Sequence, residues 1–215
     1  MQLAVFDLDG TITRHDTFVQ YVFGFLKSRP WRLFGFLIAL PTVVLYLLGR
    51  VDRGKLKEAV IRWTLGGSRR ADLDEWTQRF VPRLLERGVF KDAVERIARH
   101  KRDGDVLVLM SASPDFYVPA IARELGFTEV TCTGVRWSGD RLDGHLTTLN
   151  CRGPEKARRF EALRGRQPGI PTSAYGNAGS DLEHLALAEH GVLVNGAATA
   201  RRKAAKAGIA CENWI

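Results

Sequence analysis

Two carboxylates, two residues apart, follow the first apolar run of the chain. Asp7 and Asp9 come after Leu3–Phe6, whose four apolar residues predict a buried strand. In an extended segment, side chains at positions i and i+2 point the same way, so both carboxylates can face one point beyond the strand. Such a pair can act with one carboxylate as nucleophile and the other as acid and base. The alternative is an acidic turn in which Gly10 provides the bend.

Three later segments carry polar side chains that would meet this pair. Ser111 follows a predicted strand, and its hydroxyl and backbone N–H groups such as that of Ala112 can bind a phosphoryl oxygen. Lys156 adds a compact positive charge. Asn177 and Asp181 follow another predicted strand, with oxygen ligands of the type that Mg²⁺ prefers. Because ligands of open α/β sheets bind at the carboxyl ends of strands, we expect these residues to converge there.

The elements that would position these residues alternate between strands and helices. The predicted strands are 3–6, 105–110, 171–176 and 192–194 (the last), with a hairpin of 129–137 and 141–148. The predicted helices are 52–65, 68–87, 90–102, 154–164 and 181–189, and Pro114 would lie in the first turn of another. This order predicts an α/β fold, a doubly wound, Rossmann-like parallel sheet with right-handed crossovers.

Composition indicates a globular chain in a reducing compartment. With 215 residues, 45% hydrophobic and 26% charged, the chain would form one domain, or one domain carrying an insert. Cys132, Cys151 and Cys211 are far apart, which argues against a disulfide framework or a zinc site. We expect no secretory signal, because the first strand begins at about Gln2. The catalytic part is therefore expected to be cytosolic.

The net charge of +8 lies entirely in one early region. Residues 14–70 contain eleven basic and three acidic residues, and the remainder is balanced. Nucleic acid or anionic lipid could bind such a region. Nothing in it resembles a platform on which bases stack, so we do not expect nucleic acid.

An uncharged, largely apolar run lies within this basic region. It spans residues 33–49, has basic residues on both sides, and has Trp31 and Tyr46 as candidate interfacial anchors. Residues on both sides must return to one site, so a single crossing is excluded. We expect a re-entrant or interfacial helical hairpin, bent near Pro41, at an anionic membrane surface. The alternatives are a buried core helix, a hydrophobic cap and an oligomer contact.

The motifs, in this order, resemble those of the haloacid dehalogenase superfamily of phosphotransferases. They are Asp7–Thr11, Ser111, Lys156 and Gly176–Asp181, which together span nearly the whole chain. The resemblance implies that Asp7 attacks phosphorus to give an aspartyl-phosphate, while Asp9 protonates the leaving alcohol and then activates water. Ser111, Ala112 and Lys156 would bind the transferred group.

The resemblance also implies Mg²⁺ as cofactor, held by Asp7, the backbone carbonyl of Asp9, Asn177 and Asp181. The family usually has an aspartate where Asn177 stands, which implies weaker Mg²⁺ affinity unless Asp181 compensates, directly or through water. Asp16 corresponds to an acidic residue that contacts substrate in the phosphoserine-specific enzymes. It could equally cap a helix that begins at about Thr17.

The insert between the first two motifs resembles the helical cap of the phosphoserine-phosphatase-like branch. Residues 17–87 would form this cap, and residues 1–16 and 88–215 the catalytic core. Its apolar, basic-flanked character looks more like the membrane-associated phosphatidylglycerophosphatase C group.

The leading hypothesis is therefore a Mg²⁺-dependent phosphomonoester phosphatase at the cytoplasmic face of the inner membrane. Its substrate would be a lipid phosphate such as phosphatidylglycerophosphate. One alternative is a soluble phosphatase of the phosphoserine type. Another is a membrane-binding module of the same fold without catalytic activity.

Overall fold

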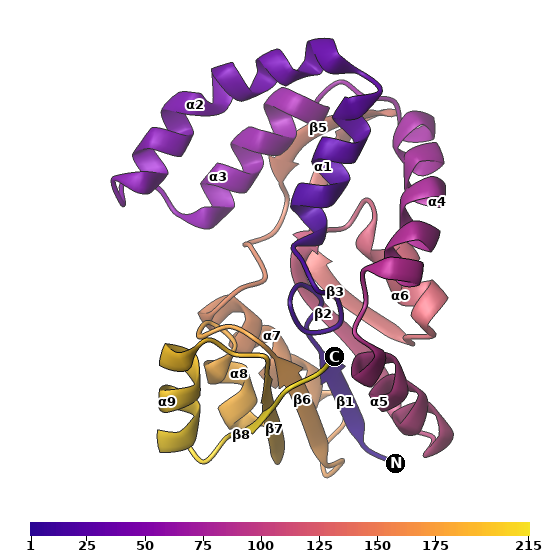
Figure 1. Cartoon of the computed structure of the whole chain (residues 1–215), viewed down its shortest axis with the longest axis vertical. Helices are drawn as coiled ribbons and strands as arrows, with labels where there is room; N and C mark the ends of the chain where they lie inside the picture. Colours follow the sequence, from indigo (N-terminus) through magenta and orange to yellow (C-terminus); the bar gives the residue numbers. More distant parts are fainter.

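A six-stranded parallel sheet forms the centre of the molecule (Figure 1), which a computed structural model describes over residues 1–215. The strands are β1 (Leu3–Phe6), β2 (Val106–Pro114), β3 (Glu129–Thr133), β6 (Thr172–Gly176), β7 (His190–Val194) and β8 (Ala210–Glu212). Their order is β3-β2-β1-β6-β7-β8, so the winding reverses between β1 and β6. The predicted α/β, doubly wound sheet is thus confirmed, and the point of reversal is where such folds bind ligands.

Strand β1 is buried on both of its faces. Leu3 and Val5 pack into one hydrophobic core, and Ala4 and Phe6 into the other, as the two-residue period of a strand requires. β1 pairs in register with both β2 and β6. The residue that follows it, Asp7, therefore starts from a rigid position.

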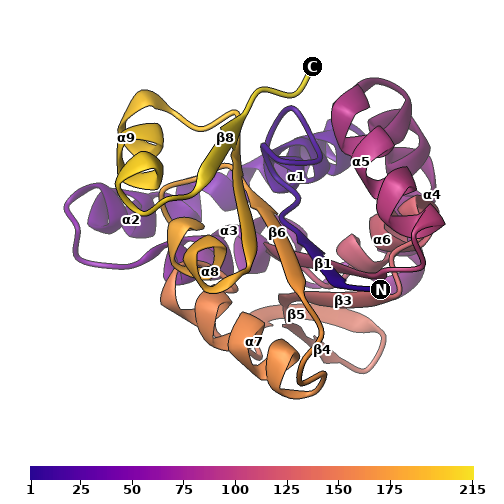
Figure 2. The same ribbon diagram turned by 90° about the horizontal axis from the view of Figure 1, so that it is seen from below.

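Helices cover both faces of the sheet (Figure 2). On one face lie α5 (Lys91–Arg102) and α6 (Val118–Leu125), and on the other α7 (Pro154–Gly165), α8 (Leu182–Leu187) and α9 (Ala198–Lys206). Two predictions were wrong here. The last strand is β8, not 192–194, and α6 begins at Val118, because β2 stays extended through Pro114.

The predicted hairpin is also shorter than expected. Its first arm, 129–137, divides at Gly134: β3 joins the main sheet beside β2, and only β4 (Val135–Ser138) pairs with β5 (Arg141–Leu146). β3 covers the edge of β2, which would otherwise leave backbone groups without partners.

A layer of helices, which we call the insert layer, lies over the carboxyl edge of the sheet (Figure 1). It consists of α1 (Thr17–Lys27), a 3₁₀ turn (Pro30–Leu33), α2 (Phe34–Leu47), α3 (Arg53–Val60), a π-helical turn (Ile61–Leu65) and α4 (Arg70–Arg87). The predicted helix 52–65 is thus α3 with the π turn. The division of the chain into core and cap at 16/17 and 87/88 stays a prediction.

Backbone hydrogen bonds join the insert layer to the core at two places. The entering and leaving segments pair with each other, where the Arg14 amide donates to Gly88 over 2.8 Å and the Phe90 amide donates to Ile12 over 2.9 Å. The β4–β5 hairpin makes the second junction, where the Gly67 amide donates to the Leu142 carbonyl over 2.8 Å. The insert layer is therefore held from two sides.

Helix α2 continues through Pro41, so the turn of the expected helical hairpin does not lie at Pro41. Proline removes a single hydrogen bond there, and α3 packs along the helix. The chain instead reverses between Leu48 and Asp52, and α2 and α3 lie side by side (Figure 1).

Most of α2 faces outward, which excludes a buried core helix. Only Gly35 and Ala39 are buried in it. Large side chains at least two-fifths exposed form what we call the exposed apolar surface: Trp31, Leu33, Phe34, Leu37, Ile38, Leu40, Val44, Leu45, Leu47 and Leu48. Residues Pro30–Leu47 are long and apolar enough to cross a bilayer, with a mean hydropathy of 1.6.

Gly35 sets the distance between α2 and the π turn. A Cβ atom on Gly35 would lie 2.0 Å from the Trp63 carbonyl oxygen, which is backbone and cannot rotate away. Gly35→Ala should therefore lower the free energy of unfolding by about 1–3 kcal/mol, measured by urea denaturation. Gly165→Ala is the control, because no atom lies within 4 Å of the added Cβ. Equal stability of both variants would contradict this packing.

Candidate active site

One buried ammonium group connects two of the predicted carboxylates. Lys156, in the first turn of α7, has its Nζ 2.7 Å from Oδ1 of Asp7 and 2.9 Å from Oδ1 of Asp181. Asp7 follows β1 and Asp181 precedes α8, so the three charges meet at the point where the sheet reverses. All three side chains are buried.

Burial and mutual attraction shift these three groups differently. Burial raises the pKa of Asp7 to about 7, against the opposing effect of Lys156. Burial would also raise the pKa of Asp181, but Lys156 outweighs it and lowers this pKa to about 2. The two carboxylates raise the pKa of Lys156 above its ordinary value despite its burial. The single ammonium group of Lys156 therefore does not offset the cost of burying the ionised Asp7 carboxylate.

The loop after β6 closes over Asp7. The amides of Asn177 and Ala178 donate to Oδ2 of Asp181 over 3.2 and 2.9 Å. The Asn177 side chain lies against Gly10, where an added Cβ would be 2.0 Å from its Nδ2. Gly10 also has a φ of +83°, so both space and conformation require glycine there.

The oxygen atoms near Asp7 suit a hard divalent cation. No group of three or more His, Cys, Asp or Glu side chains is arranged to hold a metal. The Asp7 carboxylate and the Asn177 amide oxygen are nevertheless donors of the type Mg²⁺ accepts. Asp181 has both oxygens engaged, by Lys156 and by the two amides. It would therefore orient the loop or act through water.

Asp9 is held by hydrogen bonds to both carboxylate oxygens. Oδ1 accepts from the Thr17 amide at 2.6 Å and from its hydroxyl at 2.7 Å, and Oδ2 accepts from the Ser113 hydroxyl at 2.6 Å. Tyr117 in turn contacts the Thr17 hydroxyl over 2.9 Å. Burial, with a smaller effect of Asp16, raises the pKa of Asp9, although these hydrogen bonds oppose the rise. A fixed carboxyl with a raised pKa is suited to proton transfer.

A cavity of about 390 Å³ contains most of the predicted site residues. Those that line it are Asp7, Asp9, Asp16, Ala112, Lys156, Asn177 and Asp181. Ser111 does not: it is fully buried, and its Oγ accepts from the Ser113 amide at 3.0 Å. Its contact with a phosphoryl group stays a prediction. Asp16 caps α1 by accepting from the Val19 amide at 2.9 Å, as one of the two interpretations predicted, and its contact with substrate stays a prediction.

Several polar residues that line the cavity are not predicted as site residues from the sequence. They include Arg53, Lys57, Ser113, Asn150 and Arg152. Ser113 could have been found, since it belongs to the same strand end as Ser111. Lys57 is one of the basic residues that follow the apolar run, and its Nζ donates to the Asn150 Oδ1 at 2.8 Å and to the Ala112 carbonyl. It belongs to the site.

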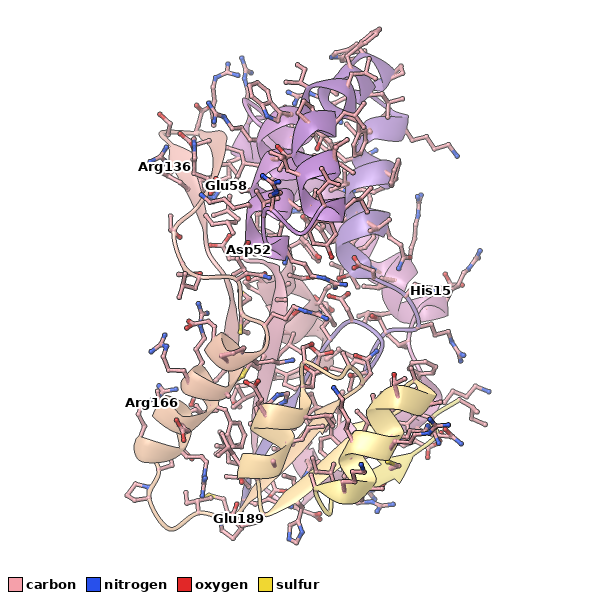
Figure 3. The ribbon with its side chains drawn as sticks, turned by 90° about the vertical axis from the view of Figure 1, so that its left-hand side faces the viewer. His15, Asp52, Glu58, Arg136, Arg166 and Glu189 are labelled. Atoms are coloured by element: carbon pink, nitrogen blue, oxygen red, sulfur yellow. The ribbon has the colours of Figure 1, made fainter.

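Three other titratable side chains near the predicted motifs do not line the cavity. His15 is exposed on the segment entering the insert layer and points outward in Figure 3. Glu183 is exposed and does not line the cavity. His184 is buried beside Asp181 with no hydrogen-bond partner, and burial lowers its pKa to about 3, so it packs as a neutral ring.

Comparison with known proteins agrees with this geometry. Residues 4–186 match the family of haloacid dehalogenase-like hydrolases. Protein CicA of Caulobacter vibrioides is 37% identical over 194 residues, which cover 87% of this chain and 83% of that protein. A protein named "Probable phosphatase" from Mycobacterium tuberculosis is 33% identical over 110 residues, half of this chain and 38% of that protein.

Solved structures share the fold. A structure described as a phospho-aspartyl intermediate analogue of phosphoserine phosphatase has a TM-score of 0.68 at 15% identity, covering 99% of this chain and 92% of that one. The chain belongs to the haloacid dehalogenase-like hydrolases. It is a hydrolase of this family, similar in fold to the phosphoserine phosphatases.

Removing the central cation should destabilise the protein in a pH-dependent way. Lys156→Met leaves two buried carboxylates facing each other, which should lower the free energy of unfolding by about 3–5 kcal/mol at pH 8. In this variant both acids have higher pKa values in the folded state than in the unfolded state. Their protonation as the pH falls therefore restores part of the lost free energy of unfolding. Guanidinium denaturation with a chelator at pH 8 and pH 5.5 measures this difference.

The control is Lys206→Met, which removes an exposed lysine of α9. It should leave the free energy of unfolding within about 0.5 kcal/mol of the wild type at both pH values. A Lys156→Met loss that is the same at both pH values would show that these carboxylates do not share the cation.

Proposed function

We propose that the protein is a Mg²⁺-dependent phosphomonoester phosphatase acting on a membrane lipid phosphate, with phosphatidylglycerophosphate as the preferred substrate. The observation that carries the proposal is that one cavity contains both the carboxylates and three further cations. None of these three cations forms an ion pair with a carboxylate. The proposal places the protein at the cytoplasmic face of the inner membrane.

The three cations are Arg53, Lys57 and Arg152, which all line the cavity. The Arg53 Nε donates to the Tyr46 hydroxyl over 3.0 Å, and Lys57 donates only to neutral oxygens. The Arg152 side chain makes no hydrogen bond or ion pair. Lys156, by contrast, has two carboxylate partners. The free cations fit a second anionic group on the substrate, next to the phosphate that is removed.

Phosphatidylglycerophosphate has two such groups, a terminal phosphomonoester and a phosphodiester. Phosphatidic acid has the monoester alone. The arrangement of charge therefore favours the first lipid over the second.

Membrane binding is supported by the exposed apolar surface and by the charges around it. Contiguous apolar patches of this kind are rare on soluble monomers and mark interaction sites. Lys27 and Arg50 are exposed near the two ends of α2. Each basic residue close to an anionic lipid surface adds about 1 kcal/mol of attraction.

In the proposed reaction, Asp7 attacks the phosphorus atom and forms an aspartyl-phosphate. Asp9 donates a proton to the departing alkoxide, so the alcohol leaves neutral. The Asp9 carboxylate then takes a proton from water, which attacks the phosphorus and releases inorganic phosphate and Asp7. Lys156 holds Asp7 in position between β1 and α7.

Mg²⁺ would be held by Asp7, the backbone carbonyl of Asp9 and Asn177, and would neutralise charge that repels the nucleophile. The raised pKa of Asp7 supports this, because a bound cation favours its ionised form. Because Asn177 is neutral, Mg²⁺ affinity should be lower than with an aspartate at this position.

A phosphate-release panel tests the function. With Mg²⁺, the wild type should hydrolyse phosphatidylglycerophosphate in anionic vesicles faster than soluble phosphoserine, and should co-sediment with the vesicles. Asp7→Asn should lower release from every substrate by about 10⁴-fold or more, because the nucleophile is lost, while co-sedimentation is unchanged. Faster hydrolysis of phosphoserine, without vesicle binding, would favour the soluble alternative. No release by folded protein would favour the catalytically silent module.

The charge of Lys57 should control the choice between the two lipids. Burial lowers its pKa to about 8, so it is charged below this pH and neutral above it. Lys57→Met should reduce kcat/KM for phosphatidylglycerophosphate about 10- to 100-fold, the effect of one lost charged hydrogen bond, and much less for phosphatidic acid. Raising the pH through 8 should lower the ratio of kcat/KM for phosphatidylglycerophosphate to kcat/KM for phosphatidic acid in the wild type. The same change of pH should leave this ratio unchanged in the Lys57→Met variant.

The pH also affects Asp7, Asp9 and Mg²⁺ binding, but these effects apply to both lipids. They therefore cancel in the ratio of the two kcat/KM values. Lys55→Met is the matched control, since Lys55 lies on the same helix but its side chain is two-thirds exposed. A ratio that Lys57→Met leaves unchanged would rule out a second anion subsite at this residue.

A further inference from the structure

The cavity that contains the carboxylates has two chemically different ends. At one end are the charged groups described above. At the other, apolar side chains from three helices of the insert layer form the wall: Phe18, Val22, Phe23, Phe36, Val43 and Leu56. Ligand sites commonly combine an apolar wall with a few polar groups that orient the ligand. A phosphate group has no apolar part that could contact these six side chains.

Helix α2 contributes to the wall through one stripe. Phe36, Val43 and Tyr46 line the cavity, and Ala39 between them is buried. The spacing of three and four residues puts all of these on one side of a helix. Val44, the next residue after Val43, is 47% exposed and belongs to the exposed apolar surface. The helix is therefore apolar on both sides, with one side facing the site.

The apolar wall continues to the surface between α1 and α2. Val19 and Phe23 line the cavity, yet each is about half exposed, at 49% and 54%. Phe23 also stacks on Phe36, with ring centroids 5.3 Å apart and an angle of 17° between the rings. A hydrocarbon chain could thus pass from the exposed apolar surface to the site along apolar side chains. Figure 1 shows α1, α2 and α3 above the carboxyl edge of the sheet.

We propose that this end of the cavity binds the hydrocarbon part of an amphiphilic phosphomonoester while its phosphate lies at Asp7. The inference rests on the proposed function and adds to it that the protein itself, not only the bilayer, binds the apolar part of the substrate. Burying each methylene removes apolar area from water, and the cavity wall gains contacts that it lacks without ligand. A small zwitterionic substrate would offer nothing to this wall.

Water-soluble substrates separate this binding from membrane attachment. The probes are n-alkyl phosphates from propyl to octyl, each below its critical micelle concentration, with Mg²⁺ and without vesicles. In the wild type, kcat/KM should rise about three- to fourfold per added methylene until the cavity is filled. The slope with chain length is measured within one protein, so differences in folded fraction cancel.

Substitutions at Val43 test whether the cavity is the cause. Val43→Trp fills the apolar end and should flatten the slope. Val43→Ala enlarges it and should move the plateau to longer chains. Val44→Trp adds the same side chain one residue away, outside the cavity, and should keep the wild-type slope. If Val43→Trp folds poorly, the position of the plateau in Val43→Ala still tests whether Val43 lines the hydrocarbon site.

The outcomes also separate this inference from the proposed function. A flat slope in the wild type, with phosphatidylglycerophosphate in vesicles still hydrolysed, would overturn the hydrocarbon site and leave the lipid phosphatase intact. A wild-type slope retained in both Val43 variants would overturn the assignment to this cavity. No release from either alkyl phosphates or vesicle lipid would overturn both proposals.

Discussion

The contact of Lys156 with Asp7 and Asp181 is the interaction on which the rest of the site depends. Three buried charges are tolerated because each has an opposite partner within 3 Å. The three residues come from the ends of different elements, and those ends meet only because β1 and β6 are neighbours at the reversal of the sheet. The topology of the sheet therefore brings the nucleophile, the cation and the loop of Asn177 together.

The insert layer connects this buried site with the outside of the molecule. α3 contributes Lys57, which reaches the core at Ala112 and Asn150. α2 has one stripe toward the cavity and a wide exposed apolar surface, with only two buried residues. A phosphatase of soluble metabolites has no need of such a surface, whereas an enzyme that takes its substrate from a bilayer does. The same helix would then contact the membrane and line the substrate site.

Local patterns placed Asp7 and Asp9 after a strand and Lys156 and Asp181 near the start of helices, and all four line one cavity. Their chemical roles stay predictions. The contacts of Lys57 could not be predicted, because its partners lie 55 and 93 residues away in sequence. Short edge elements such as β8 were missed because three residues carry little periodic signal. α2 continues through Pro41 and packs against α3, a tertiary contact that no local pattern shows. The apolar run at residues 33–49 forms the largely exposed helix α2, and such exposure is compatible with the interfacial position predicted from the sequence.

In the proposed reaction, Asp7 receives the phosphate of a lipid substrate. Rapid quenching of the wild type with phosphatidylglycerophosphate vesicles and Mg²⁺, followed by borohydride reduction and peptide mass spectrometry, tests it most directly. An acyl phosphate at Asp7 would be reduced to homoserine, and we expect this modification at Asp7 within the first turnover. Phosphate release without modification of Asp7, or with modification of another residue, would show that Asp7 is not the nucleophile.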